Sequence, residues 1–404
     1  MMITQDFKNI SFKKRAYCAV CEEKLANPTI RLTNLPLTEI YTNKKPKKLF
    51  GFADQEFFLC RRCGHGQIGN IISPEILYTS SSYFFLTSRS KTATSANDVF
   101  LAFMHSILRG RKLDNIIEIG CSDLYLLNDL RSLAKKLYGI DPVLSGRERE
   151  LSDEKITVIG GFFEDAHLEE EVPQNTLVIS SHTLEHVEDP KKMIGSLLRH
   201  ASDKTIFIHQ FPSLEPMISD LRYDQIFHQH LHYFSLSSFF SLIEMLGGEI
   251  VDYTINYLHW GALMVAFKKK SGDRKAIRMK TERLEPKRIR QDYKTFQSRM
   301  RFTNEYLTSL SGEKIYGYGA ALMLPILGYH LKNDFSSFEC ILDDDKSKEG
   351  LYYINLPVAI TTPERVKDIR SSSVMITAYN TVRSVLPRVL SFKPKRIILP
   401  THVI

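Results

Sequence analysis

The chain has no apolar run approaching the ~20 residues that a membrane-spanning helix needs. Its first residues hold no apolar stretch of the signal-peptide kind. It also has no evident sequence repeat, no low-complexity segment and no complete Gly-x-Gly-x-x-Gly run of the kind that cradles a pyrophosphate. We therefore expect no membrane span and a cytoplasmic location.

The 404 residues are 43% hydrophobic and 25% charged, which is ordinary for a globular chain of two or three domains. We predict domains at 1–80, 81–270 and 271–404. The net charge of +8 equals the surplus within Lys268–Arg290, which holds eleven basic and three acidic residues. Such a run is usually a solvated helix face, and contact with phosphates or acidic lipid is the alternative. No aromatic interleaving or recognition motif indicates a nucleic-acid partner.

Cysteine is scarce, and four of the six cysteines form two Cys-x-x-Cys pairs. Two thiolate pairs can complete a tetrahedron around one ion with no open position, which is typical of structural zinc. The alternative is two disulfides, which suit an oxidising compartment that the chain gives no sign of entering. The predicted zinc ligands are Cys18, Cys21, Cys60 and Cys63.

Short apolar strands alternate with helices after a first helix at 90–110. This pattern predicts a parallel sheet with helical crossovers. The expected strands are 115–119, 137–140, 156–159, 176–180 and 205–209, with helices at 125–134 and 190–200. A helix at 237–246 precedes a hairpin of 249–255 and 262–267. Five parallel strands and a terminal hairpin are similar to the class I methyltransferase arrangement.

A second α/β pattern follows a long polar helix predicted at 278–310. Its expected strands are 314–318, 338–342, 374–377 and 396–399, with a helix at 321–331. The segment Gly317–Ala321 lies between a strand and a helix but lacks the full glycine spacing of a dinucleotide loop. A dinucleotide-dependent oxidoreductase is therefore a weak alternative.

The first strand of the larger pattern leads into Gly120, where a missing Cβ lets a ligand approach the backbone. Asp141 ends the second strand, 21 residues later, at a distance suited to ribose hydroxyls. Because no pyrophosphate cradle is present, these residues favour S-adenosylmethionine over NAD.

Histidines cluster in two segments. His182 and His186 follow the fourth strand, over the same crevice, and His228, His230 and His232 are spaced at i, i+2 and i+4. A metal is one interpretation of the second cluster, but no carboxylate or cysteine lies close enough to complete a site locally. The other interpretation is a general base, since an imidazole can take the proton that an acceptor loses to a methyl donor.

Nearly the whole chain resembles one family, the zinc-containing sugar C-methyltransferases that act on nucleotide-linked deoxy-4-ketosugars. The likeness rests on the cysteine quartet followed by Gly64 and on a series of short motifs in the same order. These are Glu118-Ile-Gly-x-x-Asp123, Leu184-Glu-His-Val-x-Asp189, Tyr223-Asp-x-Ile, His228-x-His230-Leu, Tyr233-Phe-Ser, Gly317-Tyr-Gly-Ala-Ala321 and Asp343-Asp-Asp.

The resemblance implies an N-terminal zinc-binding module, a central methyltransferase core and a C-terminal Rossmann-like domain that helps enclose the sugar nucleotide. It also implies that His230 is the general base and that His186 lies near the sugar. We predict His228 as a further catalytic residue. The predicted cofactor-binding residues are Glu118, Gly120, Asp123, Asp141 and His182, and the predicted substrate-binding residues are Tyr83, Tyr223, Gln229, His259 and Tyr318.

Four positions depart from the family pattern. Leu124 replaces a glycine in the cofactor loop, Phe227 a tyrosine and Gln229 a glutamate, and Trp260 adds bulk after His259. These changes weaken the case for an enolate and leave O- or N-methylation of a sugar open. They also motivate an alternative, a non-catalytic sugar-nucleotide binding protein on the same scaffold. For Tyr83 the alternative is simple packing. The sequence defines no oligomeric state.

Overall fold

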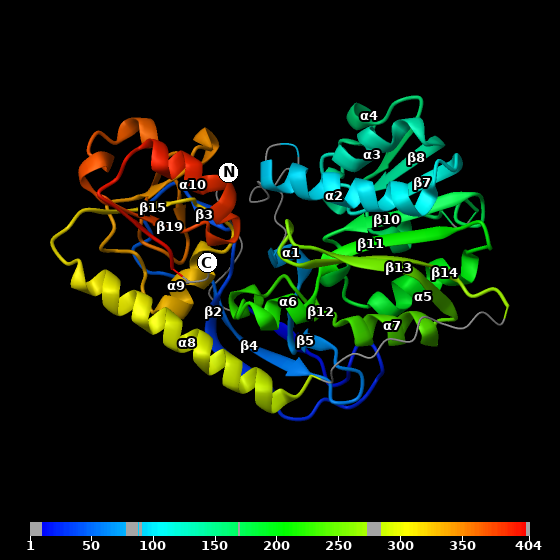
Figure 1. Cartoon of the computed structure of the whole chain (residues 1–404), viewed down its shortest axis with the longest axis horizontal. Coiled ribbons are helices and arrows are strands. Elements are labelled where there is room, and N and C mark those ends of the chain that lie inside the picture. Colours follow the sequence, from blue (N-terminus) through cyan, green and yellow to red (C-terminus); the bar gives the residue numbers. More distant parts are fainter. Residues whose placement is uncertain (1–9, 78–87, 89–90, 169, 273–283, 401–404) are drawn as a thin grey trace.

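The computed structural model describes residues 10–77, 88, 91–168, 170–272 and 284–400. One lobe is built on a seven-stranded sheet and the other on a five-stranded sheet, and the N-terminal strands lie at the base between them (Figure 1). The predicted domain boundary at residue 80 falls within 78–87, outside the described residues. Both predicted boundaries, at 80/81 and at 270/271, stay predictions.

The seven-stranded sheet has the order β13-β14-β11-β10-β7-β8-β9. Strands β7 to β11 are parallel, and the β13–β14 hairpin adds antiparallel to β11. This confirms the five parallel strands with a terminal hairpin. The bounds are β7 Leu113–Ile119, β8 Ala134–Ile140, β9 Ile156–Ile159, β10 Thr176–Ser181, β11 Ile206–Pro212, β13 Gly248–Asn256 and β14 Ala262–Lys269.

Helices cover both faces of this sheet because its strands are apolar on both sides. Ile116 packs into the cluster beneath α2 and α3, whereas its neighbour Ile117 packs into the cluster beneath α5 and α7. Asp189 caps α5 by accepting a hydrogen bond from Lys192 N at 2.9 Å. The helices of this lobe are α2 Lys91–Leu108, α3 Tyr125–Asp129, α4 Glu148–Leu151, α5 Pro190–His200, α6 Leu214–Ser219 and α7 Leu236–Met245.

The predicted helix at 125–134 is wrong in its second half. Helix α3 ends at Asp129, and β8 already begins at Ala134. Ala134 pairs with Leu113 of β7, and Leu133 O accepts a hydrogen bond from Leu113 N at 2.9 Å. Pairing with the neighbouring strand therefore overrides the helical pattern of the sequence.

The N-terminal sheet includes a strand from the segment between α6 and α7 of the larger lobe. Its order is β12-β5-β4-β2, and β12 comes from His232–Tyr233. The histidine-rich segment is thereby anchored to the cysteine module. The other bounds are β1 Phe12–Lys14, β2 Ile30–Pro36, β4 Phe52–Leu59, β5 Gly66–Ile68, β6 Asn70–Ile72 and α1 Pro74–Leu77, with β1 paired to β6.

The C-terminal lobe is Rossmann-like, with five parallel strands in the order β18-β16-β15-β19-β20. Helix α8 runs along the underside of this lobe toward the N-terminal strands (Figure 1). A two-stranded pairing of β17 with β3 joins the lobe to the N-terminal region. The bounds are α8 Pro286–Ser309, β15 Ile315–Tyr318, α9 Leu324–Leu331, β16 Ile341–Leu342, β17 Tyr352–Tyr353, β18 Ile360–Thr361, β19 Ser373–Ile376, α10 Val382–Ser391, β20 Arg396–Ile398 and β3 Tyr41–Thr42.

Three predicted elements of this lobe are shorter than expected. Helix α9 begins at Leu324 rather than at 321, and β16 covers only the end of 338–342. Helix α8 begins at Pro286, a residue suited to a first helical turn, and the earlier residues 278–283 lie outside the described residues.

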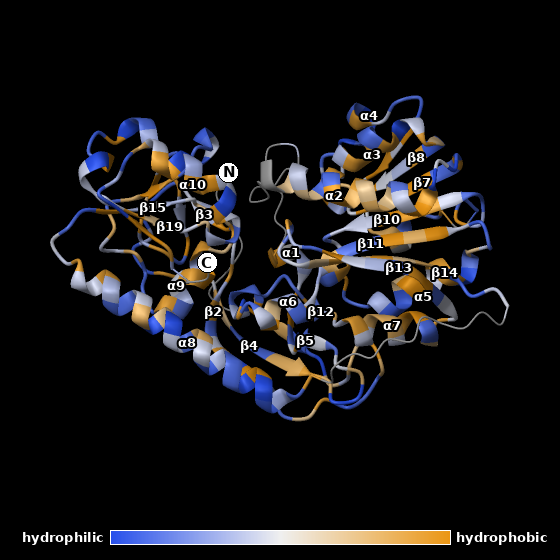
Figure 2. Cartoon of the chain, viewed as in Figure 1, coloured by the Kyte–Doolittle hydropathy of each residue, from blue (hydrophilic) through white to orange (hydrophobic). Residues whose placement is uncertain are grey.

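Hydrophobic residues concentrate on the strands and on the helix faces turned toward them (Figure 2). Within the part of the chain that the structure describes, no helix combines the length and apolar character needed to cross a membrane.

Candidate functional site

The four predicted zinc ligands lie together. Cys18 Sγ is 3.6 Å from Cys63 Sγ, and Cys21 Sγ is 3.5 Å from Cys60 Sγ, with all four sulfurs within 4.8 Å of one another. Zn–S bonds of about 2.3 Å place tetrahedral sulfurs about 3.8 Å apart, so the quartet fits one zinc ion. A disulfide would need about 2.05 Å between sulfurs, and all four thiols are free.

The backbone turns of the two cysteine pairs match each other. Glu22 N donates to Cys18 O and Gly64 N to Cys60 O, each at 3.0 Å. Each turn closes through a residue with positive φ, Glu22 at 58° and Gly64 at 76°. A Cβ on Gly64 would also lie 3.1 Å from Ser237 Oγ, so glycine suits this turn on two counts.

The cofactor crevice lies at the carboxyl ends of β7 and β8. Gly120 has φ 78°, and a Cβ there would overlap Thr183 Oγ1. Asp141 accepts hydrogen bonds from Ser122 N at 2.8 Å and Val143 N at 2.9 Å, one on each carboxylate oxygen. Each oxygen keeps a lone pair, so Asp141 can still accept from two ribose hydroxyls.

Several buried polar atoms of this crevice have no hydrogen-bond partner among the residues that the structure describes. They include Glu118 Oε2, Ser122 Oγ and Asp123 Oδ1. Burial, and then the neighbouring carboxylates Asp141 and Asp123, raise the pKa of Glu118 well above its usual value. A cationic ligand with ammonium and sulfonium groups would satisfy these acceptors and relieve the like-charge repulsion, so the residues present fit S-adenosylmethionine.

Leu124 adopts the left-handed conformation, φ 61°, that glycine would adopt with less strain. Its side chain is buried in the cluster beneath α2 and α3. A Cβ on Gly139 of β8 would lie 3.1 Å from Leu124 Cδ2, so the leucine packs against that strand. The substitution therefore adds apolar packing at the second strand of the crevice.

The segment after β10 carries a histidine–glutamate cluster against Gly120. Thr183 Oγ1 donates to Ile119 O at 3.1 Å and fixes this segment beside the first strand. His182 Nδ1 is 3.2 Å from Glu185 Oε1, and His186 Nε2 is 4.0 Å from the same oxygen. Burial raises the pKa of Glu185 to about 7, partly offset by His186.

His230 completes the cluster from the histidine-rich segment. Its ring centroid lies 5.0 Å from that of His186, and a ring nitrogen lies within 4.8 Å of both the His186 and the Glu185 donor atoms. Burial, and then His186 and His182, lower the pKa of His230 well below its usual value. The structure thus brings together His182, His186 and His230 and adds Glu185, while the roles predicted for the three histidines stay predictions.

His259 and Trp260, in the loop between β13 and β14, close the side of the cluster. The ring centroids of His182 and His259 are 3.8 Å apart, and Trp260 lies 5.8 Å from His182. Gln210 Nε2 lies 3.3 Å from His259 Nδ1 and donates to Ser181 Oγ at 3.0 Å. The added bulk of Trp260 therefore lies against His182 and His259.

The structure does not bring His228 into the cluster. Its Nε2 lies 3.0 Å from Leu35 O and its Nδ1 3.2 Å from Gln55 Nε2, so both ring nitrogens are engaged by the N-terminal sheet. Gln229 Oε1 accepts a hydrogen bond from Thr38 Oγ1 at 2.8 Å and is likewise turned toward that sheet. His228 therefore lies apart from the histidine–glutamate cluster, and its predicted catalytic role stays a prediction.

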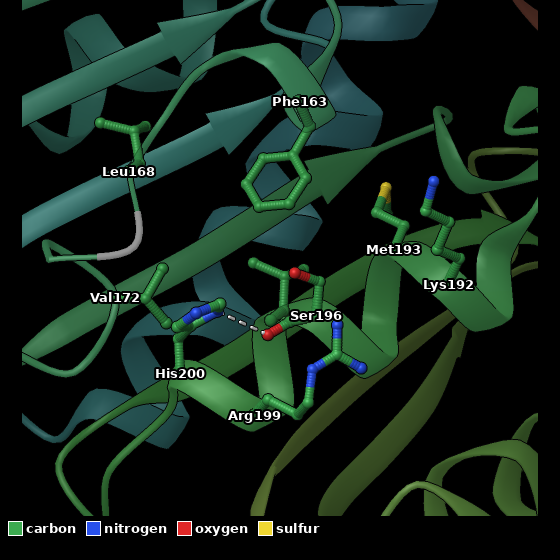
Figure 3. Close-up of a pocket in the computed structure, with 9 residues that line it drawn as sticks. Phe163, Leu168, Val172, Lys192, Met193, Ser196, Arg199 and His200 are labelled. Carbon is green, nitrogen blue, oxygen red and sulfur yellow. Dashed lines mark hydrogen bonds between the residues drawn. The ribbon is translucent and has the colours of Figure 1, made fainter.

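Two predicted substrate residues also lie elsewhere. Tyr223 is fully buried and packs against Tyr293 and Phe296 of α8. Tyr318 Oη donates to Asp344 Oδ2 at 2.6 Å in the C-terminal lobe. Tyr83 falls outside the described residues. A hollow of about 170 Å³ beside α5, lined by residues such as Phe163, Met193 and His200, contains none of the predicted site residues (Figure 3).

Sequence reasoning missed Glu185 and Gln210 as site residues. Glu185 lay within a quoted motif, and its i, i+3 spacing from His182 was the signal available in the sequence. Gln210 lies in the apolar strand β11. The contact of its amide with His259 follows from the fold, and no pattern in the sequence indicates it.

Two family models match the chain. The "Methyltransferase domain" family matches residues 93–253, and the "Putative zinc binding domain" family matches residues 18–78. Together with the seven-stranded sheet and the cysteine quartet, they define a class I methyltransferase fold joined to a zinc-binding module. The cofactors of this arrangement are S-adenosylmethionine and zinc.

Among curated proteins, the C-methyltransferase NovU of Streptomyces niveus is 25% identical over 213 residues. This alignment covers 51% of the chain and 49% of NovU, so the chain spans about half the length of the relative that it matches. Similar solved structures include magnesium protoporphyrin IX methyltransferase of Synechocystis with S-adenosylhomocysteine (14% identity, TM-score 0.35, 44% of this chain and 83% of that one). Another is the N-methyltransferase NodS of Bradyrhizobium japonicum (16%, 0.34, 45% and 90%).

Proposed function

We propose that the protein transfers a methyl group from S-adenosylmethionine to a carbon or oxygen of a nucleotide-linked sugar, in deoxysugar or surface-polysaccharide biosynthesis. The likeness to a C-methyltransferase and the order of the sequence motifs support this reaction class. A cytoplasmic location belongs to the proposal, because metal-bound thiols suit a reducing compartment.

The observation that carries the proposal is the contact between the histidine segment and the cofactor strand. Thr183 packs on Gly120, and the same short segment brings His186 within 5.0 Å, between ring centroids, of His230. This contact supports the proposal that an imidazole lies beside the bound methyl donor. In this proposal Asp141 binds the ribose hydroxyls, and His230 removes the acceptor proton as the methyl group moves.

The cofactor supplies the methyl group when it is bound, and the residues of the chain orient the reactants. Burial keeps His230 neutral at pH 7, so it can accept a proton. His186 Nδ1 lies 2.8 Å from Gln229 O, which fixes the orientation of the ring. The apolar faces of Phe227 and Trp260 help to keep water from the acceptor, since Phe227 lies 4.3 Å from His230 between ring centroids.

Two measurements test this proposal. Calorimetric titration with S-adenosylmethionine should show one site, and mass spectrometry of a sugar-nucleotide panel with labelled cofactor should show a labelled product. His230→Ala should lower turnover at least about 1,000-fold and leave cofactor affinity within a few-fold. The matched control His200→Ala, on the exposed end of α5, should retain full activity. Full activity of His230→Ala would refute the assignment of the base.

One observation favours a second candidate, a sugar-nucleotide binding protein without turnover. Gln229 is uncharged and bound to Thr38, so it gives His230 no carboxylate partner. Cofactor binding with no labelled product across the panel would support this candidate over the enzyme.

A further inference from the structure

Glu185 is a buried carboxylate. Packing alone does not explain why a carboxylate occupies this position. Its side chain is 1% exposed, and its Oε2 has no hydrogen-bond partner in the described part of the chain. Within the described ranges, no lysine or arginine forms an ion pair with it. Burial of a carboxylate without a cationic partner is costly, so such a group usually serves a purpose beyond stability.

Three imidazoles surround this carboxylate. His182 and His186 come from its own turn, at 3.2 and 4.0 Å from Oε1, and His230 comes from the opposite segment. That segment is fixed by a backbone hydrogen bond, because Leu231 N donates to Glu185 O at 2.8 Å. The main chain thus holds the residue after His230 directly against Glu185.

The other titratable groups on the elements packed against Glu185 are engaged elsewhere. His209 of β11 is hydrogen bonded to Ser180. On β12, His232 Nε2 lies 3.0 Å from Val187 O, and Tyr233 Oη donates to Gln225 O at 3.0 Å. The exchangeable protons of the cluster are therefore those of Glu185, His182, His186 and His230.

His230 alone would hold a proton poorly. Its burial and the two neighbouring histidines disfavour the imidazolium, whereas the burial of Glu185 favours its protonated form. A proton that His230 takes up is therefore held more favourably by Glu185, in the same cluster.

We propose that Glu185 receives, through His230 and His186, the proton that the acceptor loses during methyl transfer. The inference rests on the proposed function. The C–S bond of the sulfonium breaks with its electron pair left on sulfur, and the acceptor forms the new bond to the methyl carbon. The acceptor proton moves to His230 and then to Glu185, which releases it to water after the products leave. Glu185 is a positioning residue, because it acts through His230.

The test is the pH dependence of methyl transfer by the full-length, zinc-containing protein. In the wild type, kcat should fall below about pH 7, where Glu185 is already protonated and cannot accept the proton. Glu185→Gln should lower kcat about 100-fold, lose this acidic limb and bind S-adenosylmethionine within twofold of wild type. The control Glu188→Gln, three residues along at an exposed position paired with Lys13, should keep the wild-type profile.

A second variant guards against misfolding. Glu185→Ala with added formate should recover part of the lost kcat, because a small carboxylate can occupy the vacated space, and Glu185→Asp should keep the acidic limb at reduced kcat. A purely structural role would give neither result. A Glu185→Gln enzyme with kcat within threefold of wild type and an unchanged limb would overturn the inference.

Two further outcomes distinguish a failure of this inference from a failure of the proposed function. Wild-type protein that transfers no methyl group refutes the proposed function, whereas wild-type transfer with an unaffected Glu185→Gln variant refutes only the role of Glu185. Metal analysis should find one zinc per chain. A second equivalent, lost in Glu185→Gln, would show that Glu185, His186 and His230 hold an ion instead, since their donor atoms lie within 4.8 Å of one another.

Discussion

The chain contains two crevices with nearly the same backbone. In the larger lobe Gly120 follows β7 with φ 78°, and Ser122 N donates to Asp141 at 2.8 Å after β8. In the C-terminal lobe Gly319 follows β15 with φ 102°, and Ala320 N donates to Asp343 Oδ2 at 2.7 Å after β16. Each pairs a glycine after one strand with an acid after the next strand of the sheet.

The side chains around the two acids differ. Lys348 Nζ lies 3.6 Å from Asp343 Oδ2 and donates to Ala320 O at 3.0 Å, which places a cation across the second crevice. The neighbouring Asp344 is held by Arg388 at 3.0 Å. Around Asp141 the described residues include no such ion pair, and polar atoms are left unsatisfied. The same pairing of a glycine with an acid therefore leaves the acid available to a ligand in the larger lobe. In the C-terminal lobe, the acid is already paired with Lys348.

This difference bears on the dinucleotide alternative for Gly317–Ala321. A dinucleotide would have to displace Lys348 from Asp343 before its ribose could bind. The contacts of the second crevice therefore disfavour an oxidoreductase.

The largest expected effect comes from zinc, which should affect the two lobes unequally. Cys18 and Cys60 pack into the cluster beneath α5 and α7 of the larger lobe. Cys60→Ser should release the zinc and unfold the turns around it, because structural zinc contributes on the order of 10 kcal/mol in small modules. Zinc analysis should fall from one equivalent to near zero.

Hydrogen exchange should locate this damage. Protection should be lost in the N-terminal sheet and in β12, and largely kept in the five-stranded sheet of the C-terminal lobe. The control Cys340→Ser, away from the quartet, should retain its zinc. Retained stoichiometric zinc in Cys60→Ser would contradict the ligand assignment.

The next largest effect is on cofactor affinity, and it should differ between variants of Asp141 and Asp343. Asp141→Ala removes two hydrogen bonds expected to the ribose, each worth about 1.5 kcal/mol, and should weaken S-adenosylmethionine binding about 100-fold. Asp343→Ala changes the equivalent residue of the other crevice and should leave this affinity unchanged in calorimetric titration. Equal losses in the two variants would show that the second crevice also takes part in cofactor binding.

The comparison also shows what the sequence could predict. Alternating apolar strands and the Cys-x-x-Cys spacing are local patterns, and they predicted the seven-stranded sheet, the zinc module and four strands of the C-terminal sheet. The two-residue edge strand β18, Ile360–Thr361, was missed because it is too short to show a pattern. The environments of His228 and Gln229 depend on the N-terminal sheet, whose partners Leu35 and Thr38 lie about 190 residues earlier. No local pattern encodes such a contact. Lys348 was missed for the same reason, since only the turn after β16 aims it at Asp343.

A smaller effect should appear in the pH dependence of stability. Glu39 is buried, and its burial raises its pKa from 4.5 to about 7, partly offset by the charge of Lys348. Between these values the folded chain holds a proton that the unfolded chain has lost, so stability should fall as pH rises from about 4.5 to 7 and then level off. The total loss is on the order of 3 kcal/mol.

Glu39→Gln should remove this dependence and be more stable than wild type at pH 8. Thermal unfolding from pH 5 to 8 measures it. The control Glu22→Gln, on the exposed zinc-module surface, should keep the wild-type slope. If the stability of Glu39→Gln depended on pH as steeply as that of wild type, the titrating group would be a residue other than Glu39.

The smallest effect is that of the cation that closes the second crevice. Lys348→Met leaves Asp343 with its two backbone donors, Ala320 N and Asp345 N, but without its charge partner. Both members of the pair are 15% exposed, so the loss should be about 1–2 kcal/mol in urea unfolding. Lys135→Met, which breaks an exposed pair with Asp114, should cause no measurable change.

If Lys348 alone excludes nucleosides from this crevice, Lys348→Met should bind a second equivalent of S-adenosylmethionine. We expect the stoichiometry to stay at one, because Tyr318 and Arg388 still hold Asp344 beside Asp343.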